Sequence, residues 1–441
     1  MRYPSRLIGT MSRGAGAAGA SLVLLSVLGL AGCGELLEVQ APSRVLEENL
    51  KKASNAKLLV DGARAAFGCA FQAYIQGGAL LTDEMEDTQL AAAAWPWDRR
   101  DWNGSLGQAY AESSCSAFQI FGVYTPLQTA RFTAEEAITA ITGFSDEEVP
   151  TKPRLLAEAN LLLGYSRVLL GEGFCSAAEN QGPQLFPDDF FTLAEASFAE
   201  AITQAQAASN TDIQRAALVG RARARVGLAR LPGQTVNTAK YAEAKADAAQ
   251  VPSGFVYNMP YSQAAIFAQN NIVQRNRLSL LYGVAPNYRN LADPRVVVTA
   301  GSRGADAVST VWYADKYPAL NTPIPLATWR EAQLIVAEAE LAAGNTAAAI
   351  GVLDALRGRT GVGLPAYSGP TDAASVQAFL ISERAKELFL EGHHFWDINR
   401  FNLPLDPPVG APYPIKGGSY ADLRCLPLPD VERLNNPNIG S

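Results

Sequence analysis

The stretch Ile381–Phe401, ISERAKELFLEGHHFWDINRF, decides the predicted fold. Its apolar positions recur in steps of four and three residues, which places them on one stripe of an α-helix; they are Ile381, Ala385, Leu388, Gly392 and Phe395. Glu383, Glu387 and Glu391 follow at four-residue intervals on a neighbouring stripe. Like charges at this spacing repel by roughly 0.2–0.5 kcal/mol per pair. The stretch therefore predicts one helix whose acidic stripe is met by cations from elsewhere in the chain.

The pattern E-R-x-x-E-L-x-x-E-G-x-x-x-W-D-x-x-R-F in this stretch resembles the signature segment of the SusD/RagB family. The matching residues are Glu383, Arg384, Glu387, Leu388, Glu391, Gly392, Trp396, Asp397, Arg400 and Phe401. One position differs from the family pattern: His394 stands where the family usually has arginine. The charge of a histidine side chain depends on pH. Asp293-Pro294-Arg295, Arg330–Ala339 and Leu426–Asn438 resemble further family segments. The resemblance implies a mainly α-helical, tetratricopeptide-like scaffold with this segment as a buried ionic core.

Residues 1–32 are predicted to be a lipoprotein signal peptide. Arginines at positions 2, 6 and 13 precede the apolar run Ser21–Leu30, and small residues lead into Cys33. The uncharged run Gly14–Gly32 has almost the length of a membrane span, but a cysteine directly after small residues favours cleavage and lipidation of Cys33. Residues 33–57 are then a lipidated tether.

Residues 58–441 are predicted to form a single domain. Its helical scaffold comprises 58–250 and 326–403, interrupted by a loop-rich insertion with a few short strands at 251–325 and followed by a tail at 404–441. The helix pairs resemble the ~34-residue tetratricopeptide unit. Capping boxes are predicted at Thr133, Thr192 and Thr328, each three residues before a glutamate. A run of arginines on one helix has two interpretations, a solvated face or the cations for the glutamate stripe: Arg221, Arg223, Arg225 and Arg230.

Composition narrows the class of protein. The formal net charge is −7, and removal of the three arginines before Cys33 makes it more negative, which argues against a nucleic-acid partner. Four of the five cysteines follow Cys33, and in an exported chain they allow two disulfides with three connectivities. Cys69 with Cys115 is the pairing we favour, because both lie on helices predicted to be neighbours. No cysteine spacing indicates a zinc site.

The predicted ligand surface centres on Ala91–Leu106, AAAAWPWDRRDWNGSL. Its proline and Asn-Gly pair indicate a loop, and tryptophan rings in a polar loop suit stacking on a sugar ring. The alternative is that one or two rings pack the loop onto the helices beneath. The insertion 251–325 adds further aromatic residues, and the acidic stretch Thr82–Gln89 is expected to be a solvated loop, since its spacing is not that of a calcium loop. The candidate contacts are Trp95, Trp97, Trp102, Asn103, Tyr282, Trp312 and Tyr313.

The family resemblance implies a non-catalytic lipoprotein that captures a glycan or another oligomeric nutrient. It implies delivery to a SusC-like TonB-dependent transporter, a lipid-anchored position on the outer membrane facing the cell exterior, and no cofactor. Two alternatives stay open, a helical-repeat scaffold that binds no nutrient and a glycoside hydrolase, which needs only two carboxylates. The only two histidines, His393 and His394, are adjacent, so the sequence does not indicate a nucleophilic triad.

Overall fold

The computed structural model describes residues 52–89, 95–101 and 122–439. The predicted signal peptide, Cys33, Trp102, Asn103 and Cys115 lie outside the described residues. In the described ranges, no helix combines the length and the apolar character needed to cross a membrane.

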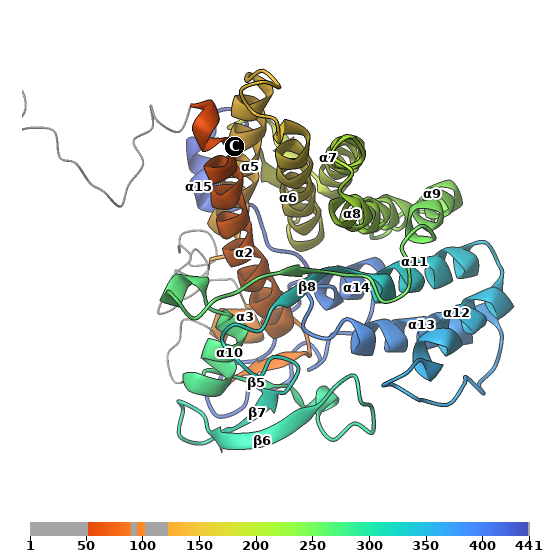
Figure 1. Ribbon diagram of the computed structural model, residues 1–441. Coiled ribbons are helices and arrows are strands. Elements are labelled where there is room, and N and C mark those ends of the chain that lie inside the picture. Colours follow the sequence, from red (N-terminus) through yellow and green to blue (C-terminus); the bar gives the residue numbers. More distant parts are fainter. Residues whose placement is uncertain (1–51, 90–94, 102–121, 440–441) are drawn as a thin grey trace, which may run out of the picture. The chain divides into compact units, whose positions relative to one another are not determined.

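The first half of the chain forms a row of helices that pack in sequence order (Figure 1). After the 3-10 turn η2 (Ala53–Asn55), they are α2 (Ala56–Leu81), α5 (Tyr124–Thr142), α6 (Lys152–Gly173), α7 (Pro187–Ala207), α8 (Thr211–Ala229) and α9 (Thr238–Ala248). Small residues allow close contact: the Phe198 ring of α7 fills the space between Gly164 of α6 and Gly220 of α8. A Cβ on Gly164 would lie 2.7 Å from this ring, so a larger residue does not fit without displacement.

A second group of helices packs beneath α8 and α9 in Figure 1. It contains α11 (Trp329–Ala342), α12 (Thr346–Gly358), α13 (Ala373–Glu387) and α14 (His394–Arg400), and the tail adds α15 (Asp430–Asn435). Thr328 is the N-cap of α11, because its side chain accepts a hydrogen bond from the Glu331 amide at 3.0 Å, which is one of the two bonds of the predicted capping box. The other two predicted capping boxes are wrong, since Thr133 and Thr192 lie inside α5 and α7. The mainly α-helical, paired-helix prediction is confirmed.

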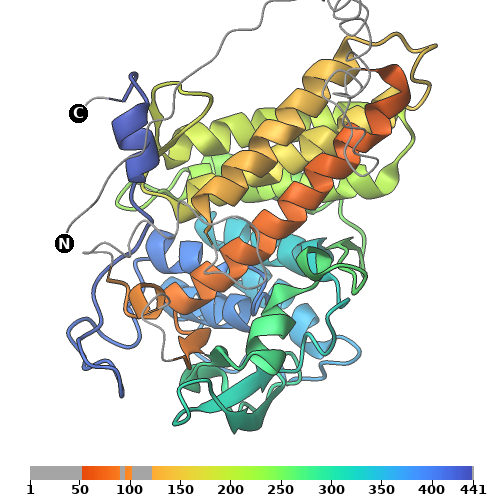
Figure 2. The ribbon, with the colours of Figure 1, turned by 90° about the vertical axis from the view of Figure 1, so that its left-hand side faces the viewer.

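The strands are short and pair antiparallel in twos. The pairs are β1 (Met85–Asp87) with β5 (Tyr282–Val284), β2 (Ala177–Ala178) with β3 (Gln184–Leu185), β4 (Val256–Met259) with β8 (Ile324–Thr328), and β6 (Val298–Arg303) with β7 (Thr310–Ala314). Short helical turns α3 (Trp95–Asp98), η3 (Ile266–Ala268), α10 (Asn271–Val273), η4 (Gln274–Leu278) and η5 (Pro286–Tyr288) connect them. Figure 2 shows α2 running from the helical row to the strands of the insertion.

The predicted single helix over Ile381–Phe401 is wrong, because the stretch forms α13 and α14 with a turn between them. Leu390 and Gly392 adopt positive φ angles of 54° and 78° in this turn, which end the helix. Carbonyl groups of this turn, which lie beyond the end of α13 at Glu387, find side-chain donors. Lys316 Nζ donates to the Phe389 carbonyl at 2.6 Å, and Tyr317 Oη donates to the Leu390 carbonyl at 2.9 Å.

The predicted cations for the glutamate stripe are present. Glu383, Glu387 and Glu391 are all buried, and each pairs with at least two basic side chains. The partners are Arg295 and Arg357 for Glu383, Arg295, Arg330 and Arg359 for Glu387, and Lys316 and Arg330 for Glu391.

The arginine run of α8 does not supply these cations, and that interpretation is wrong. Arg223 forms a buried ion pair with Glu172, while Arg221 pairs with Asp247 and Arg225 with Glu195 and Asp247. The run instead joins α8 to α6, α7 and α9. Three of its four arginines are only partly exposed and Arg223 is buried, so a fully solvated face is not observed either.

Cys175 and Cys425 form a disulfide that attaches the tail to the end of α6. The Cys175 amide also donates to the Leu426 carbonyl at 2.8 Å. Cys69 is disulfide-bonded as well. Its predicted partner, Cys115, lies outside the described residues, so the Cys69–Cys115 pairing stays a prediction.

Candidate functional site

The two segments predicted to share a ligand surface lie side by side. Strand β1 pairs with β5, with Met85 opposite Val284, and the Thr88 amide donates to the Leu281 carbonyl at 2.9 Å. The turn α3 packs against β1 and α2. The N-terminal acidic and tryptophan-containing segment therefore meets the insertion 251–325 at the end of α2 that lies near β5 in Figure 1.

The acids of Thr82–Gln89 do not form the solvated loop that the sequence predicted. Asp87 is buried and accepts a hydrogen bond from Lys416 Nζ at 2.6 Å. Glu86 is half-buried and forms an ion pair with Arg289. These contacts join β1 to the insertion and to the C-terminal tail, so the segment is held in place from two sides.

His394 acts as a cation at the position of the family's arginine. Its Nε2 lies 2.6 Å from Asp83 Oδ1. Burial by itself lowers the pKa of His394, but the hydrogen bond to Asp83 and the charges of Asp83, Glu84 and Asp397 raise it to about 9. The ring is therefore protonated at neutral pH. Burial raises the pKa of the neighbouring Glu84, which accepts a hydrogen bond from the Leu390 amide, to about 7.

The stability of the protein is expected to fall as the pH rises through about 9. Because the pKa of His394 is higher in the folded state, the protonated ring stabilises the fold. This stabilisation is present in full below the unfolded-state pKa of about 6.5 and is lost as the pH rises through the folded-state pKa of about 9. The difference between the two pKa values corresponds to about 3 kcal/mol. Urea unfolding of the wild type and His394→Asn across neutral and alkaline pH measures this. Deprotonation of the buried Glu84 near pH 7 also lowers the stability as the pH rises, and it does so in both proteins. Equal pH dependence of the two proteins above pH 7 would contradict the assignment to His394.

Trp312 and Tyr313 lie on β7 and are both partly exposed. The Arg289 guanidinium stacks on the Trp312 ring at 5.2 Å from its centroid, and Arg289 also pairs with Glu86. Tyr313 covers Gly301 of β6, and its ring contacts the Arg277 guanidinium at 5.1 Å. Adjacent residues of a strand point to opposite faces, so the two rings serve different surfaces. Trp312 is the ring on the side of β1.

Trp97 and Tyr282 are corrected from candidate contacts to core residues. Trp97 is 0% exposed, and its ring lies so close to Gly77 of α2 that a Cβ there would be 2.7 Å away. Tyr282 is 1% exposed, with its ring against Arg275. The alternative that tryptophans pack the loop onto the helices therefore holds for Trp97. The side chain of Trp95, like Trp102 and Asn103, lies outside the described residues.

A hollow of about 160 Å³ opens beside this surface. Its polar lining consists of Thr82, Asp83, Glu86, Asp98, Asn287, Asp406 and Tyr420. Asn287 Nδ2 donates to Asp83 at 2.9 Å and to Asp406 at 2.6 Å, so the lining is internally ordered. Burial raises the pKa of Asp98 to about 7. Glu86 lines the hollow and pairs with Arg289, and the Arg289 guanidinium stacks on Trp312, so two side-chain contacts connect the hollow to this aromatic ring.

Sequence reasoning missed Arg289, Asn287 and Asp406. Asp406 lies 119 residues from Asn287 in the sequence, and neither belongs to a motif. Among the segments that line this hollow, only the acidic stretch Thr82–Gln89 stood out in the sequence, and it was predicted to be a solvated loop. In the part of the chain that the structure describes, no three His, Cys, Asp or Glu side chains are grouped to hold a metal ion.

Residues 331–422 match the model of the SusD family. The fold is similar to solved structures that cover nearly the whole chain. A SusD-like carbohydrate binding protein from Bacteroides vulgatus has a TM-score of 0.60 and 13% identity over 88% of this chain and 97% of its own. A putative sugar binding protein from the same organism has a TM-score of 0.62 and 14% identity, covering 88% and 98%. A SusD superfamily protein from Parabacteroides distasonis has a TM-score of 0.61 and 13% identity, covering 90% and 99%. These likenesses show the shared fold. No curated protein matches the chain by sequence.

Proposed function

We propose, from the premise that this chain belongs to the SusD family, that it is a non-catalytic protein that captures carbohydrate. The observation that carries the proposal is the partly exposed Trp312 ring, which the Arg289–Glu86 ion pair connects to the polar hollow at the β1–β5 junction. A tryptophan face stacks on the apolar face of a sugar ring, while carboxylate, amide and hydroxyl groups bind its hydroxyls. Two of the solved structures with this fold are named as carbohydrate- or sugar-binding proteins.

The proposal includes the place of the protein in the cell. Lipidation of Cys33 would anchor the chain to the outer membrane, facing the exterior, with a SusC-like TonB-dependent transporter as the partner that receives the ligand. Its support is the predicted signal peptide before Cys33 and the family membership. The part of the predicted tether 33–57 that precedes η2 would connect the domain to this anchor, since η2 and the start of α2 take up residues 53–57.

A binding screen tests the proposal. The full chain is titrated with neutral oligosaccharides, namely maltoheptaose, cellohexaose, laminarihexaose and xylohexaose, and intrinsic tryptophan fluorescence reports binding. We expect at least one to bind with a change in intensity or wavelength and to be recovered without hydrolysis. Release of reducing sugar would favour the glycoside hydrolase, and binding of none of the four at millimolar concentration would contradict carbohydrate capture and favour the scaffold.

A further inference from the structure

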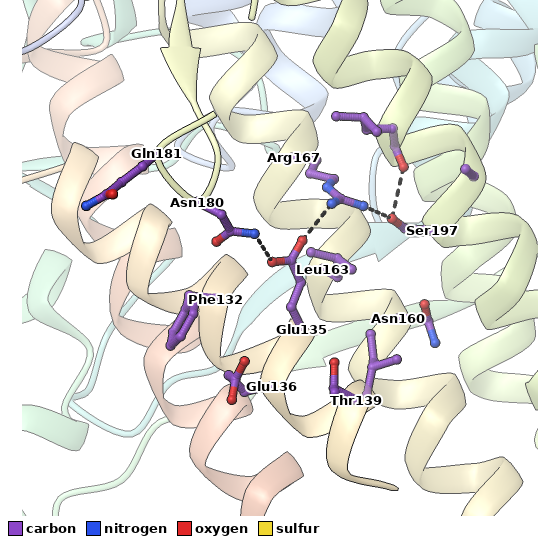
Figure 3. Close-up of a pocket in the computed structure, with 13 residues that line it drawn as sticks. Phe132, Glu135, Glu136, Thr139, Asn160, Leu163, Arg167, Asn180, Gln181 and Ser197 are labelled. Carbon is purple, nitrogen blue, oxygen red and sulfur yellow. Dashed lines mark hydrogen bonds and ion pairs between the residues drawn. The ribbon is translucent and has the colours of Figure 1, made fainter. Parts of the chain in front are cut away.

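A second hollow lies on the helical row, far along the chain from the β1–β5 junction. It is a groove of about 760 Å³ between α5, α6 and α7, closed at one end by the turn between β2 and β3. Its volume is within the range of about 300–1,000 Å³ typical of small-ligand sites. Figure 3 shows the residues of the three helices and of the turn that line this groove. None of the residues proposed above to bind ligand lines it.

A rigid charged network forms the floor of the groove. Glu135 stands at its centre in Figure 3, where it accepts hydrogen bonds from Arg167 at 2.7 Å, Arg131 at 2.6 Å and Asn180 at 3.1 Å. Arg167 also donates to Glu179 at 2.8 Å. Arg167 is the one basic side chain among the described residues that line the groove, and two carboxylates already neutralise it. The groove therefore offers no free cation for a phosphate or carboxylate ligand.

The rim presents groups without protein partners. In the described ranges, Glu136, Thr139 and Gln181 make no side-chain hydrogen bond or ion pair, although all three line the groove. The Phe132 ring lies on the same helix as Glu136 and is 48% exposed. An exposed aromatic face beside a free carboxylate, a hydroxyl and an amide is a set of groups that complements an uncharged polyol.

The backbone of the turn gives an independent indication of function. Its central residues, Asn180 and Gln181, both have positive φ angles, 53° and 57°, and the Gly182 amide closes the turn on the Glu179 carbonyl at 2.8 Å. Turns with two positive φ angles strongly favour Asn-Gly, because a side chain at the second position is strained. The chain has Gln181 at this position, and its side chain lines the groove.

The C-terminal tail holds this strained turn. Asn438 Nδ2 donates to the Gln181 carbonyl at 2.8 Å, and Asn436 Nδ2 donates to the Gly182 carbonyl at 2.9 Å. Strained backbone that the surrounding structure supports is a feature of ligand-binding sites. The backbone of Gln181, from which its side chain reaches the groove, is therefore held from outside the turn.

We infer that the groove between α5, α6 and α7 is a second saccharide site, which binds a neutral sugar through the Phe132 ring and the side chains of Glu136, Thr139 and Gln181. This inference goes beyond the proposed function, because it assigns a separate site on the helical row. Two sites on one chain would allow a long glycan, or two chains of it, to be held at once, which raises the overall affinity without new contacts.

The test uses the full chain with Trp312→Ala, which weakens the first site, and isothermal titration with the same four neutral oligosaccharides. We expect residual binding that Phe132→Ala weakens by about tenfold or more and Gln181→Gly by about fivefold. Gln181→Gly relieves the positive φ angle, so its thermal midpoint should equal or exceed that of the parent. Ser209→Gly is the matched control, because Ser209 is exposed with a φ of 53° and does not line the groove.

The outcomes separate this inference from the proposed function. If the wild type binds one equivalent of oligosaccharide and Trp312→Ala binds none, the second site is overturned and the proposed function stays in place. If one equivalent of oligosaccharide still binds to Trp312→Ala but no longer binds after Phe132→Ala, the result supports a site in the groove and contradicts the first site. Residual binding that neither Phe132→Ala nor Gln181→Gly changes also overturns the inference, as does the absence of binding in every variant.

Discussion

Arg400→Met is expected to lower the free energy of unfolding by about 3–5 kcal/mol. The Arg400 side chain is 0% exposed. Its guanidinium donates to Glu338 Oε2 at 2.9 Å and to Asp397 Oδ1 at 2.9 Å. Removal of this cation leaves Glu338 and Asp397 buried with less compensation, because Arg384 alone then pairs closely with Asp397, at 2.9 Å. Urea denaturation at neutral pH measures the loss.

Arg433→Met is the control for this prediction. Arg433 also pairs with an aspartate, Asp430, but its side chain is 55% exposed, so its loss should change stability by less than about 1 kcal/mol. A similar small effect of Arg400→Met would contradict the view that the ionic core depends on this residue. Arg400→Lys provides a second measurement if Arg400→Met does not fold, and its single ammonium is expected to restore only part of the stability.

Trp312→Ala is expected to weaken the binding of the best oligosaccharide at the β1–β5 junction by about thirtyfold. Aromatic residues at the centre of a binding surface typically contribute about 2 kcal/mol or more. The ring also shields the Arg289–Glu86 ion pair, so its removal exposes this pair to water. Fluorescence or calorimetric titration of the full chain gives the affinity.

Phe186→Ala is the matched control, since Phe186 is 51% exposed at the N-terminal end of α7 and lines neither hollow. Trp312→Phe keeps an aromatic face and should retain most of the affinity. Unchanged affinity in Trp312→Ala, with a single equivalent bound, would exclude this ring as the ligand contact. The hollow at the β1–β5 junction would then lose the observation on which its assignment depends.

The sequence predicted those features that depend on neighbours along the chain. Apolar spacing predicted the helix pairs, and Thr328 followed by Glu331 predicted the start of α11, because both depend on contacts within one or two turns. The repulsion between Glu383, Glu387 and Glu391 predicted that basic side chains pair with them, but it did not predict which ones. Arg295 comes from the insertion, 88 residues before Glu383, and no local rule selects it over the arginines of α8.

The candidate site was only partly predictable for the same reason. Trp97 and Trp312 both stand among polar residues in the sequence, but Trp97 is buried because the glycine at position 77 of α2 leaves room for its ring. Trp312 stays partly exposed, with the Arg289 guanidinium stacked on its ring. The partners that order the hollow, Asn287 and Asp406, belong to no motif.

The sequence by itself determined the helical class, the likeness to the SusD family over residues 331–422 and the need for a buried ionic core, since periodicity and charge spacing are properties of consecutive residues. Tertiary structure alone decided that Ile381–Phe401 ends one helix and begins another. The turn at Leu390 and Gly392 forms because Lys316 and Tyr317, from the insertion, satisfy the carbonyl groups that the broken helix leaves free. These donors lie 73 residues away in the chain, and packing alone brings them there.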